Sequence, residues 1–408
     1  MKKRQLLTMI FGLLLIWQAP AMAGELDMLV DKLVDKGVLT KKDGDLILSV
    51  QKSEKDKATK ELISTVALPA FIKNTKFKGD FRLRYELNDR DEKEDRHRGR
   101  YRYRLGLETM LDEEFLVGLG LASGSNDPRS TNQSFTNSFE TPDIRLDYAY
   151  ATYKPKALPW LQVTAGQMIN PLWLPGGSFL WDGDIRPQGV AAVMNRKFDG
   201  FELFMTNGFF IIDEISDSSQ DPLMWVAQPG YKVNLGKQAY FKNALAWYMF
   251  TDVEGSTLDY SSKTNTLDGK VLADDYDAIV VSGELGYNTG IAFMPFAAAY
   301  GEYVKNIATD LDDDTGYGVG IKVGHEKVKQ GMWQAGLGYH ELERDAWLDI
   351  LPDSDTFGGE TNMEAILAKL TYGLRDYVEL TACYIRGERL EGDNIDENLF
   401  QADVVFKF

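Results

Sequence analysis

The chain ends in the ten residues Leu-Phe-Gln-Ala-Asp-Val-Val-Phe-Lys-Phe, which run from Leu399 to Phe408. Successive side chains of a β-strand point to opposite faces, so this segment has one apolar face and one polar face. The apolar face carries Phe400, Ala402, Val404, Phe406 and Phe408, and the polar face carries Gln401, Asp403 and Lys407. A strand of this kind is typical at the end of an outer-membrane β-barrel, where it closes the barrel and directs aromatic side chains towards lipid.

The opposite end of the chain has the three parts of a secretory signal peptide. A positive start, Met1–Arg4, precedes an apolar run over 6–17, and Ala21-Met22-Ala23 has the pattern of a cleavage site. We therefore predict a signal peptide over 1–23. Its removal takes away Lys2, Lys3 and Arg4 and changes the formal charge from −17 to −20. A chain this acidic is not expected to bind nucleic acid.

A short periplasmic α-helical segment is predicted over 24–68. Residues 25–36 carry apolar side chains at helical spacing, and Gly37 is suited to end that helix. Thr40–Asp43 resembles a capping box and is expected to begin a second helix. A segment this short cannot bury a core of its own. We expect it to pack on itself, on a neighbouring subunit or on the periplasmic rim of a barrel over 69–408.

From Thr75 onwards the apolar residues recur with a period of two, the pattern of transmembrane strands. Short links alternate with longer polar segments, as in outer-membrane barrels, which have tight periplasmic turns and long outer loops. The arrangement predicts an all-β antiparallel barrel of about 16 strands, with both termini in the periplasm. The short links are at 112–113, 155–159, 198–200, 236–237, 288–290, 327–330 and 374–376, and the longer segments at 88–99, 123–142, 169–187, 213–222, 252–275, 305–314, 346–360 and 388–397.

Several motifs resemble those of the Putative porin family of Gram-negative bacteria. They are Ala165–Trp173 (AGQMINPLW), Leu180–Gly189 (LWDGDIRPQG), Leu351–Gly359 (LPDSDTFGG) and, near the N-terminus, Leu33–Thr40 (LVDKGVLT). The resemblance covers nearly the whole mature chain. It implies a porin-type pore whose third outer loop folds into the barrel, and it names no solute.

Arginines gather on one face of the first predicted strands. A lipid-facing arginine costs about 2–4 kcal/mol at the membrane midplane, so these side chains are expected to face the lumen as a basic wall. Such a wall attracts anions and orients dipolar solutes. Alternatively, Asp80, Glu86, Glu108 and Asp147 neutralise the arginines in an ion-pair network. The predicted pore-lining arginines are Arg82, Arg84, Arg100, Arg102, Arg104 and Arg145.

The segment 169–187 is the predicted constriction loop. It contains Trp173, Trp181, Asp182 and Asp184, and its prolines and glycines favour defined turns. Because exposed tryptophans are unfavourable, we expect the loop to fold into the pore, with Asp182 and Asp184 opposite the arginines. The alternative is a surface loop whose tryptophans pack on the rim.

The sequence favours a passive diffusion channel for small hydrophilic solutes or ions. A substrate-selective channel is the first alternative, and an outer-membrane enzyme or an adhesion barrel is the second. The three histidines, His97, His325 and His340, have no convincing serine nucleophile near them, so no catalytic residue is predicted. The acidic run 310–316 lacks EF-hand spacing, so no metal and no cofactor are predicted. The expected partners are outer-membrane lipid, lipopolysaccharide, the barrel assembly machinery and small solutes, with a homotrimer as a candidate assembly.

Overall fold

The computed structural model describes residues 40, 42, 49, 73–216, 220–309 and 311–408. Its large compact unit spans Asn74–Phe408. The predicted signal peptide (1–23) and most of the predicted helical segment (24–68) lie outside the described residues and stay predictions. Within the described part of the chain, helices long and apolar enough to cross a membrane do not occur.

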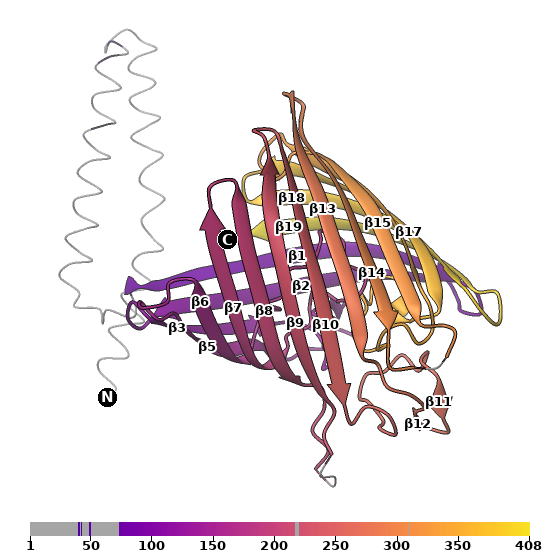
Figure 1. Ribbon diagram of the computed structural model, residues 1–408. Helices are drawn as coiled ribbons and strands as arrows, with labels where there is room; N and C mark the ends of the chain where they lie inside the picture. Colours follow the sequence, from indigo (N-terminus) through magenta and orange to yellow (C-terminus); the bar gives the residue numbers. More distant parts are fainter. Residues whose placement is uncertain (1–39, 41, 43–48, 50–72, 217–219, 310) are drawn as a thin grey trace, which may run out of the picture. The chain divides into compact units, whose positions relative to one another are not determined.

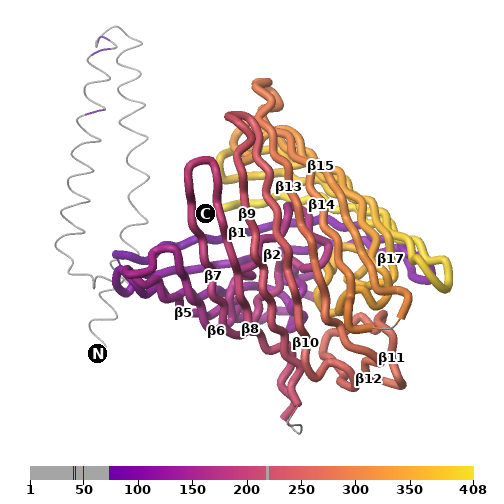
Figure 2. Tube along the Cα trace, in the orientation of Figure 1, coloured from indigo at the N-terminus to yellow at the C-terminus, as the bar shows by residue number. Residues whose placement is uncertain are grey.

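The strands of this unit form one antiparallel sheet that closes on itself (Figures 1 and 2). Of its 17 strands, β4 (Gln133–Ser134) is a two-residue addition beside β2, and the other 16 form the barrel wall. The predicted barrel of about 16 strands is therefore confirmed. The wall strands are β1 (Thr75–Arg90), β2 (Arg96–Met110), β3 (Phe115–Ala122), β5 (Arg145–Tyr153), β6 (Leu161–Gln167), β7 (Gln188–Phe198), β8 (Phe201–Ile211), β9 (Leu223–Leu235), β10 (Ala239–Thr251), β13 (Ala278–Ile291), β14 (Met294–Asn306), β15 (Thr315–Gly324), β16 (Trp333–Leu342), β17 (Met363–Arg375), β18 (Val378–Arg389) and β19 (Asp396–Lys407).

The barrel is closed by the two ends of its sheet, β1 and β19. Their register runs from Asp80 opposite Lys407 to Arg90 opposite Glu397. Beyond the last strand residue, Gly79 N donates to Phe408 O at 2.7 Å and Phe408 N donates to Gly79 O at 3.0 Å. The C-terminal Phe408 therefore takes part in the pairing of β1 with β19, here called the seam. Its ring lies 6.1 Å from that of Tyr103 on the outer face.

Side chains of the wall strands alternate between the lumen and the outer surface. On β1, Arg82 and Arg84 are buried, whereas Leu83 and Tyr85 between them are exposed. Strands such as β10 are apolar on both faces because their inner face packs on other protein rather than on water. There Ala246 and Tyr248 are buried, while Trp247 points outwards. For such strands the sequence pattern could not show which side chains point to the lumen and which to the outer surface, since both environments are apolar.

Short and long connections alternate around the barrel, with two corrections to the predicted bounds. The predicted loop 88–99 is mostly strand, and the predicted loop 388–397 includes strand residues at both of its ends, because β1 and β19 stay paired up to Arg90 and Glu397. The ion pair between these two residues, at 3.1 Å, holds the extension together. The predicted turn at 288–290 lies within β13, which continues past a bulge to Ile291. Two small elements lie in the long loops: the hairpin of β11 (Leu267–Asp268) and β12 (Val271–Leu272), and the 3-10 turn η1 (Phe357–Gly359).

Gly79→Ala tests the importance of the seam. A Cβ at Gly79 would lie 2.4 Å from Arg104 O and 2.6 Å from the Phe408 ring, so the seam must shift to admit it. An unpaired strand edge in lipid leaves backbone groups unsatisfied at several kcal/mol each. We expect less heat-modifiable barrel on electrophoresis and a lower unfolding temperature for Gly79→Ala. The matched control is Gly301→Ala, where the nearest atom would be 3.4 Å away. Equal amounts of folded barrel from both variants would contradict the prediction.

Candidate functional site

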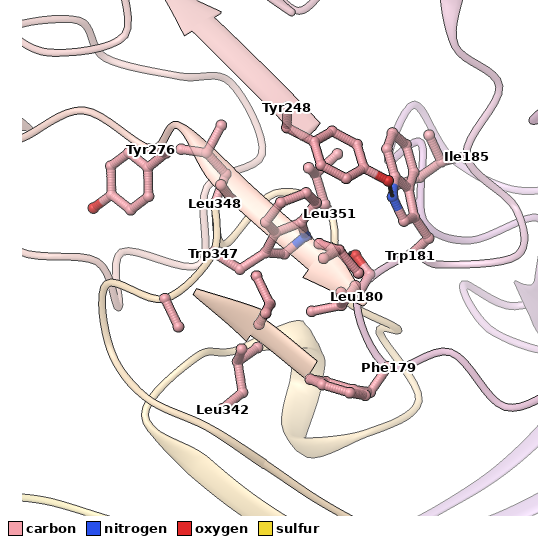
Figure 3. Close-up of a cluster of buried hydrophobic side chains, with 14 of the residues drawn as sticks. Phe179, Leu180, Trp181, Ile185, Tyr248, Tyr276, Leu342, Trp347, Leu348 and Leu351 are labelled. Carbon is pink, nitrogen blue, oxygen red and sulfur yellow. Dashed lines mark hydrogen bonds between the residues drawn. The ribbon is translucent and has the colours of Figure 1, made fainter. Parts of the chain in front are cut away.

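The connection between β6 and β7, residues 168–187 and here called loop 3, packs inside the barrel. Figure 3 shows Phe179, Leu180 and Trp181 among the buried side chains. Trp181 Nε1 donates to Tyr248 Oη at 3.3 Å, and the Phe179 ring stacks on His340 at 5.1 Å. A surface position would leave this apolar area in water, so its burial stabilises the folded-in loop.

Loop 3 is held against the barrel wall by close backbone contacts. A Cβ at Gly177 would lie 2.7 Å from Tyr300 Oη, so the backbone approaches the wall as closely as glycine permits. Trp173 N and O hydrogen-bond the buried Gln228 side chain at 2.8 and 2.9 Å. Lys242 Nζ lies 4.4 Å from the centre of the Trp173 ring, within the range of a cation–π contact.

A second loop folds inwards beside loop 3, and the sequence did not lead us to expect this second inward fold. Loop 7, residues 343–362 between β16 and β17, buries Trp347 completely. Trp347 Nε1 donates to Leu180 O of loop 3 at 2.8 Å, and its ring packs edge-on against Tyr248 at 4.8 Å (Figure 3). The signal was available, because Trp347, Leu348 and Leu351 needed burial as much as the tryptophans of loop 3 did.

Carboxylates of loop 7 bind loop 5, the connection 252–277 between β10 and β13. Asp349 Oδ2 accepts hydrogen bonds from Ser261 Oγ at 3.0 Å and from Thr264 N at 2.9 Å. Asp345 Oδ1 accepts the Tyr276 hydroxyl at 2.7 Å. Burial, followed by the charge of Asp345, raises the pKa of Tyr276, so this hydroxyl remains a donor.

Arg129, in the connection 123–144 between β3 and β5 (loop 2), binds loops 5 and 7 together. Its side chain is buried and reaches both of them. Nη1 donates to Asp349 O at 3.0 Å and to Ser262 Oγ at 3.1 Å, and Nη2 donates to Tyr260 O at 3.0 Å. Hydrogen bonds from a charged donor are stronger than neutral ones. One guanidinium therefore joins three loops that are distant in the sequence.

Five of the six predicted arginines lie together on β1 and β2, facing the lumen; we call Arg82, Arg84, Arg100, Arg102 and Arg104 the arginine wall. Each is close to a carboxylate. Arg102 and Arg104 both contact Asp80 at 2.8 Å, Arg84 contacts Asp403 at 2.7 Å, Arg100 contacts Glu86 at 3.1 Å, and Arg82 lies 3.7 Å from Asp403.

The remaining predicted members of this charge cluster lie elsewhere. Arg145 Nε donates to Gly124 O at 3.2 Å, and its nearest acidic partner is Asp143 at 4.0 Å. In the sheet register, the small Ala122 separates Arg145 from Arg104. Asp147 pairs with Arg186 at 3.1 Å and Glu108 with Lys78, so neither of these acids pairs with the arginine wall.

Loops 3 and 7 present carboxylates to the arginine wall. Asp184 Oδ1 accepts Arg104 Nη1 at 3.2 Å, and Asp355 Oδ2 accepts Arg84 Nη1 at 2.8 Å. Asp182 has a different partner set, because its oxygens accept Asp184 N and Ser354 N, both at 2.8 Å. It therefore joins loop 3 to loop 7 through backbone groups.

The loop carboxylates differ in their protonation behaviour. Burial, and then the charge of Asp353, raises the pKa of Asp182. Burial, and then the charge of Asp355, raises the pKa of Asp353. Burial acts in the same direction on Asp355, but the adjacent Arg84 outweighs it and holds the pKa of Asp355 below its usual range.

Between the arginine wall and these loops lies a cavity of about 420 Å³, here called the aperture. Its lining includes Arg82, Arg102, Asp182, Asp353, Lys369 and Cys383. Since one water occupies about 30 Å³ in the liquid, a small solute can fit there together with water. The opposite inner wall, on β7–β10 and β13–β16, is covered by loops 3 and 7.

Solved structures of outer-membrane proteins are similar to this chain, and one of them, with a TM-score above 0.5, supports the fold. The high-pH structure of Pseudomonas putida OprB has a TM-score of 0.53 at 12% identity, over 83% of this chain and 95% of that one. A loop-deletion mutant of Vibrio cholerae OmpT has a TM-score of 0.47 at 11% identity, over 82% and 99%. A triple mutant of the Rhodopseudomonas blastica porin has 0.46 at 10% identity, over 82% and 100%. No curated protein matches the chain.

A family model described as Putative porin matches residues 87–281 and 274–408. The match begins within β1 and continues to the C-terminal Phe408, so it spans the arginine wall on β2, the inward loops and the closing strand. Together with the closed 16-stranded barrel and its charged aperture, it shows that the chain belongs to the Putative porin family and is an outer-membrane channel protein.

Proposed function

We propose that this porin passes small hydrophilic solutes and ions through a charge-selective constriction between the arginine wall and loops 3 and 7. The observation that carries the proposal is the pair of contacts from loop to wall, Arg104–Asp184 at 3.2 Å and Arg84–Asp355 at 2.8 Å. Cations on the strands and anions on the loops place opposite charges on the two sides of the aperture. Such an arrangement orients dipolar solutes and tunes ion preference.

Ion pairing within the wall does not remove this field. The pairs are short and directional, so each leaves a local dipole rather than a neutral surface. Arg84, for example, forms ion pairs with Asp403 on the neighbouring strand and with Asp355 on loop 7. Both predicted roles, a stabilising network and a selectivity element, thus belong to the same residues.

A role in transport rather than in catalysis is supported by the contacts of the histidines. His340 is buried and stacks on Phe179 of loop 3. His325 lies beside the turn after β15, where its ring contacts Trp333 O at 3.1 Å. Both side chains thus contact other parts of the barrel, and we propose that the protein is not an enzyme.

Substitution of the charged residues tests the selectivity. Arg102→Gln with Arg104→Gln should shift the reversal potential in a salt gradient towards cation preference, and Asp184→Asn with Asp355→Asn should shift it towards anions. We expect about a threefold change in permeability ratio at 0.1 M salt, which shrinks at 1 M as the Debye length falls from about 10 to about 3 Å. Arg386→Gln, half-exposed outside the aperture, is the control. Unchanged ion preference in both double variants would assign the arginine wall to folding alone.

Removal of the Arg129 side chain tests whether the inward loops limit the aperture. Arg129→Ala takes the shared donor from loops 5 and 7, at about 1.5–3 kcal/mol for each hydrogen bond to a charged group. We expect higher single-channel conductance and faster uptake of larger sugars by proteoliposomes, with heat-modifiability of the barrel retained. The control is Arg375→Ala, which changes an exposed arginine at the end of β17. Conductance equal to that of the parent protein would show that Arg129 does not limit the aperture.

We also propose that the long loops are outside the cell and that both termini are periplasmic, because the short turns lie at the same end of the even-stranded barrel as Thr75, where β1 begins, and Phe408. An epitope tag after Asp393, between β18 and β19, should be detected on intact cells. A tag after Gly236, between β9 and β10, should be detected only after permeabilisation. Detection of both tags on intact cells would contradict this orientation.

Insertion by the barrel assembly machinery, contact of the outer loops with lipopolysaccharide and a homotrimeric assembly remain part of the proposal. The outer surface of the barrel supports contact with lipid, since exposed side chains such as Leu83, Trp247 and Leu370 are apolar. The acidic run 310–316 is suited to bridging by divalent ions to lipopolysaccharide.

A further inference from the structure

We propose that the aperture is a binding site for zwitterionic solutes of the size of a small α-amino acid. The carboxylate of the solute would lie at Arg82 and Lys369, and its ammonium group at Asp353. This inference rests on the proposed function, because it assumes that solutes reach the aperture. It adds a class of solute that fits the distribution of charges there.

The cationic half of the site has hydrogen-bonding capacity to spare. Lys369 of β17 is exposed to the aperture, and among the residues that the structure describes no carboxylate lies within 4.0 Å of its Nζ. Arg82 is buried, and its Nη2 donates to Asn132 Oδ1; within the described part of the chain its Nε has no hydrogen-bond partner, and its Nη1 is 3.7 Å from Asp403. A buried donor without an acceptor is unfavourable. A carboxylate bound between Arg82 and Lys369 would compensate both groups.

The anionic half lies on loop 7. Asp353 Oδ1 accepts Asp355 N at 3.0 Å, whereas no hydrogen bond within the described ranges involves Asp353 Oδ2. The neighbouring carboxylates are already engaged, Asp355 by Arg84 and Asp182 by two backbone amides. Asp353 is therefore the acid of the aperture that is best placed to receive a cationic group.

The two halves together select a dipolar solute. A simple anion at Arg82 would leave Asp353 without compensation, and a simple cation at Asp353 would face the guanidinium groups. A zwitterion satisfies both sites at once, and charged groups in a partly buried site are stabilised when paired and hydrogen-bonded. The volume of about 420 Å³ admits a small amino acid with its hydration water.

Cys383, the single cysteine of the chain, provides a reporter inside the site. It lies opposite Lys369 in the register of β17 and β18 and lines the same cavity. A bound solute between Lys369 and the loops would hinder access of a reagent to the thiol. The native protein can thus be tested without an introduced label.

The experiment measures the rate at which methyl methanethiosulfonate modifies Cys383 in proteoliposomes, together with single-channel conductance. The probes are L-alanine, neutral lactamide, acetate and methylammonium at equal concentration. L-Alanine should slow modification and reduce the ion current in a saturable way, at least about threefold more effectively than each other probe, as expected for one additional partly solvated charge contact. Lys369→Met and Asp353→Asn should each abolish this advantage. Lys305→Met, on an exposed lysine outside the aperture, should keep it.

Each other outcome overturns a defined part of the proposal. Equal protection by acetate and L-alanine would mean a simple anion site, and equal protection by methylammonium a simple cation site. A conducting channel in which none of the four probes protects Cys383 would refute the zwitterion site but leave the proposed function intact. Absence of conductance would refute the proposed function itself.

Discussion

Hydrocarbon offers no hydrogen-bond partners to a peptide backbone, and the architecture of this protein depends on that constraint. Each wall strand pairs with two neighbours, and the last free edges, on β1 and β19, pair with each other. The reciprocal hydrogen bonds of Gly79 and Phe408 complete the seam at its end. The terminal Phe does more than point at lipid, because its backbone N–H and C=O both take part in the closure.

Closure of so large a barrel creates a lumen that side chains alone do not fill. Loops 3 and 7 fill one side of it, and Trp181, Tyr248 and Trp347 form the contact between loops and wall. The inner faces of the strands beneath these loops consequently carry many apolar side chains, such as Ala246 and Tyr248. The arginine wall occupies the other side, where carboxylates pair with the guanidinium groups. The aperture thus lies beside the axis of the barrel, bounded by strands on one side and loops on the other.

The ion pairs of the aperture stabilise the fold and, in the proposed function, also line the transport path. Asp403 binds Arg84 through both of its oxygens, at 2.7 and 2.9 Å, across the seam between β1 and β19. This bidentate pair lies where the barrel closes and beside the proposed transport path, so it stabilises the seam and orients the guanidinium. Asp355 then reaches the same arginine from loop 7. A few groups outside these pairs, Lys369 and Asp353 among them, remain able to interact with a solute.

The sequence alone determined the class of fold, the strand count and the inward course of loop 3, because a period of two, alternating link lengths and costly exposed tryptophans are local properties of the chain. It also placed the five residues of the arginine wall on the lumen face, since alternation along a strand depends only on neighbouring residues. Only the tertiary structure decided which carboxylate pairs with which arginine, as Arg84 and Asp403 are 319 positions apart. The inward fold of loop 7 and the three-loop contact of Arg129 were decided there as well. Such contacts depend on the curvature of the closed sheet, which brings distant strands and loops into reach of each other.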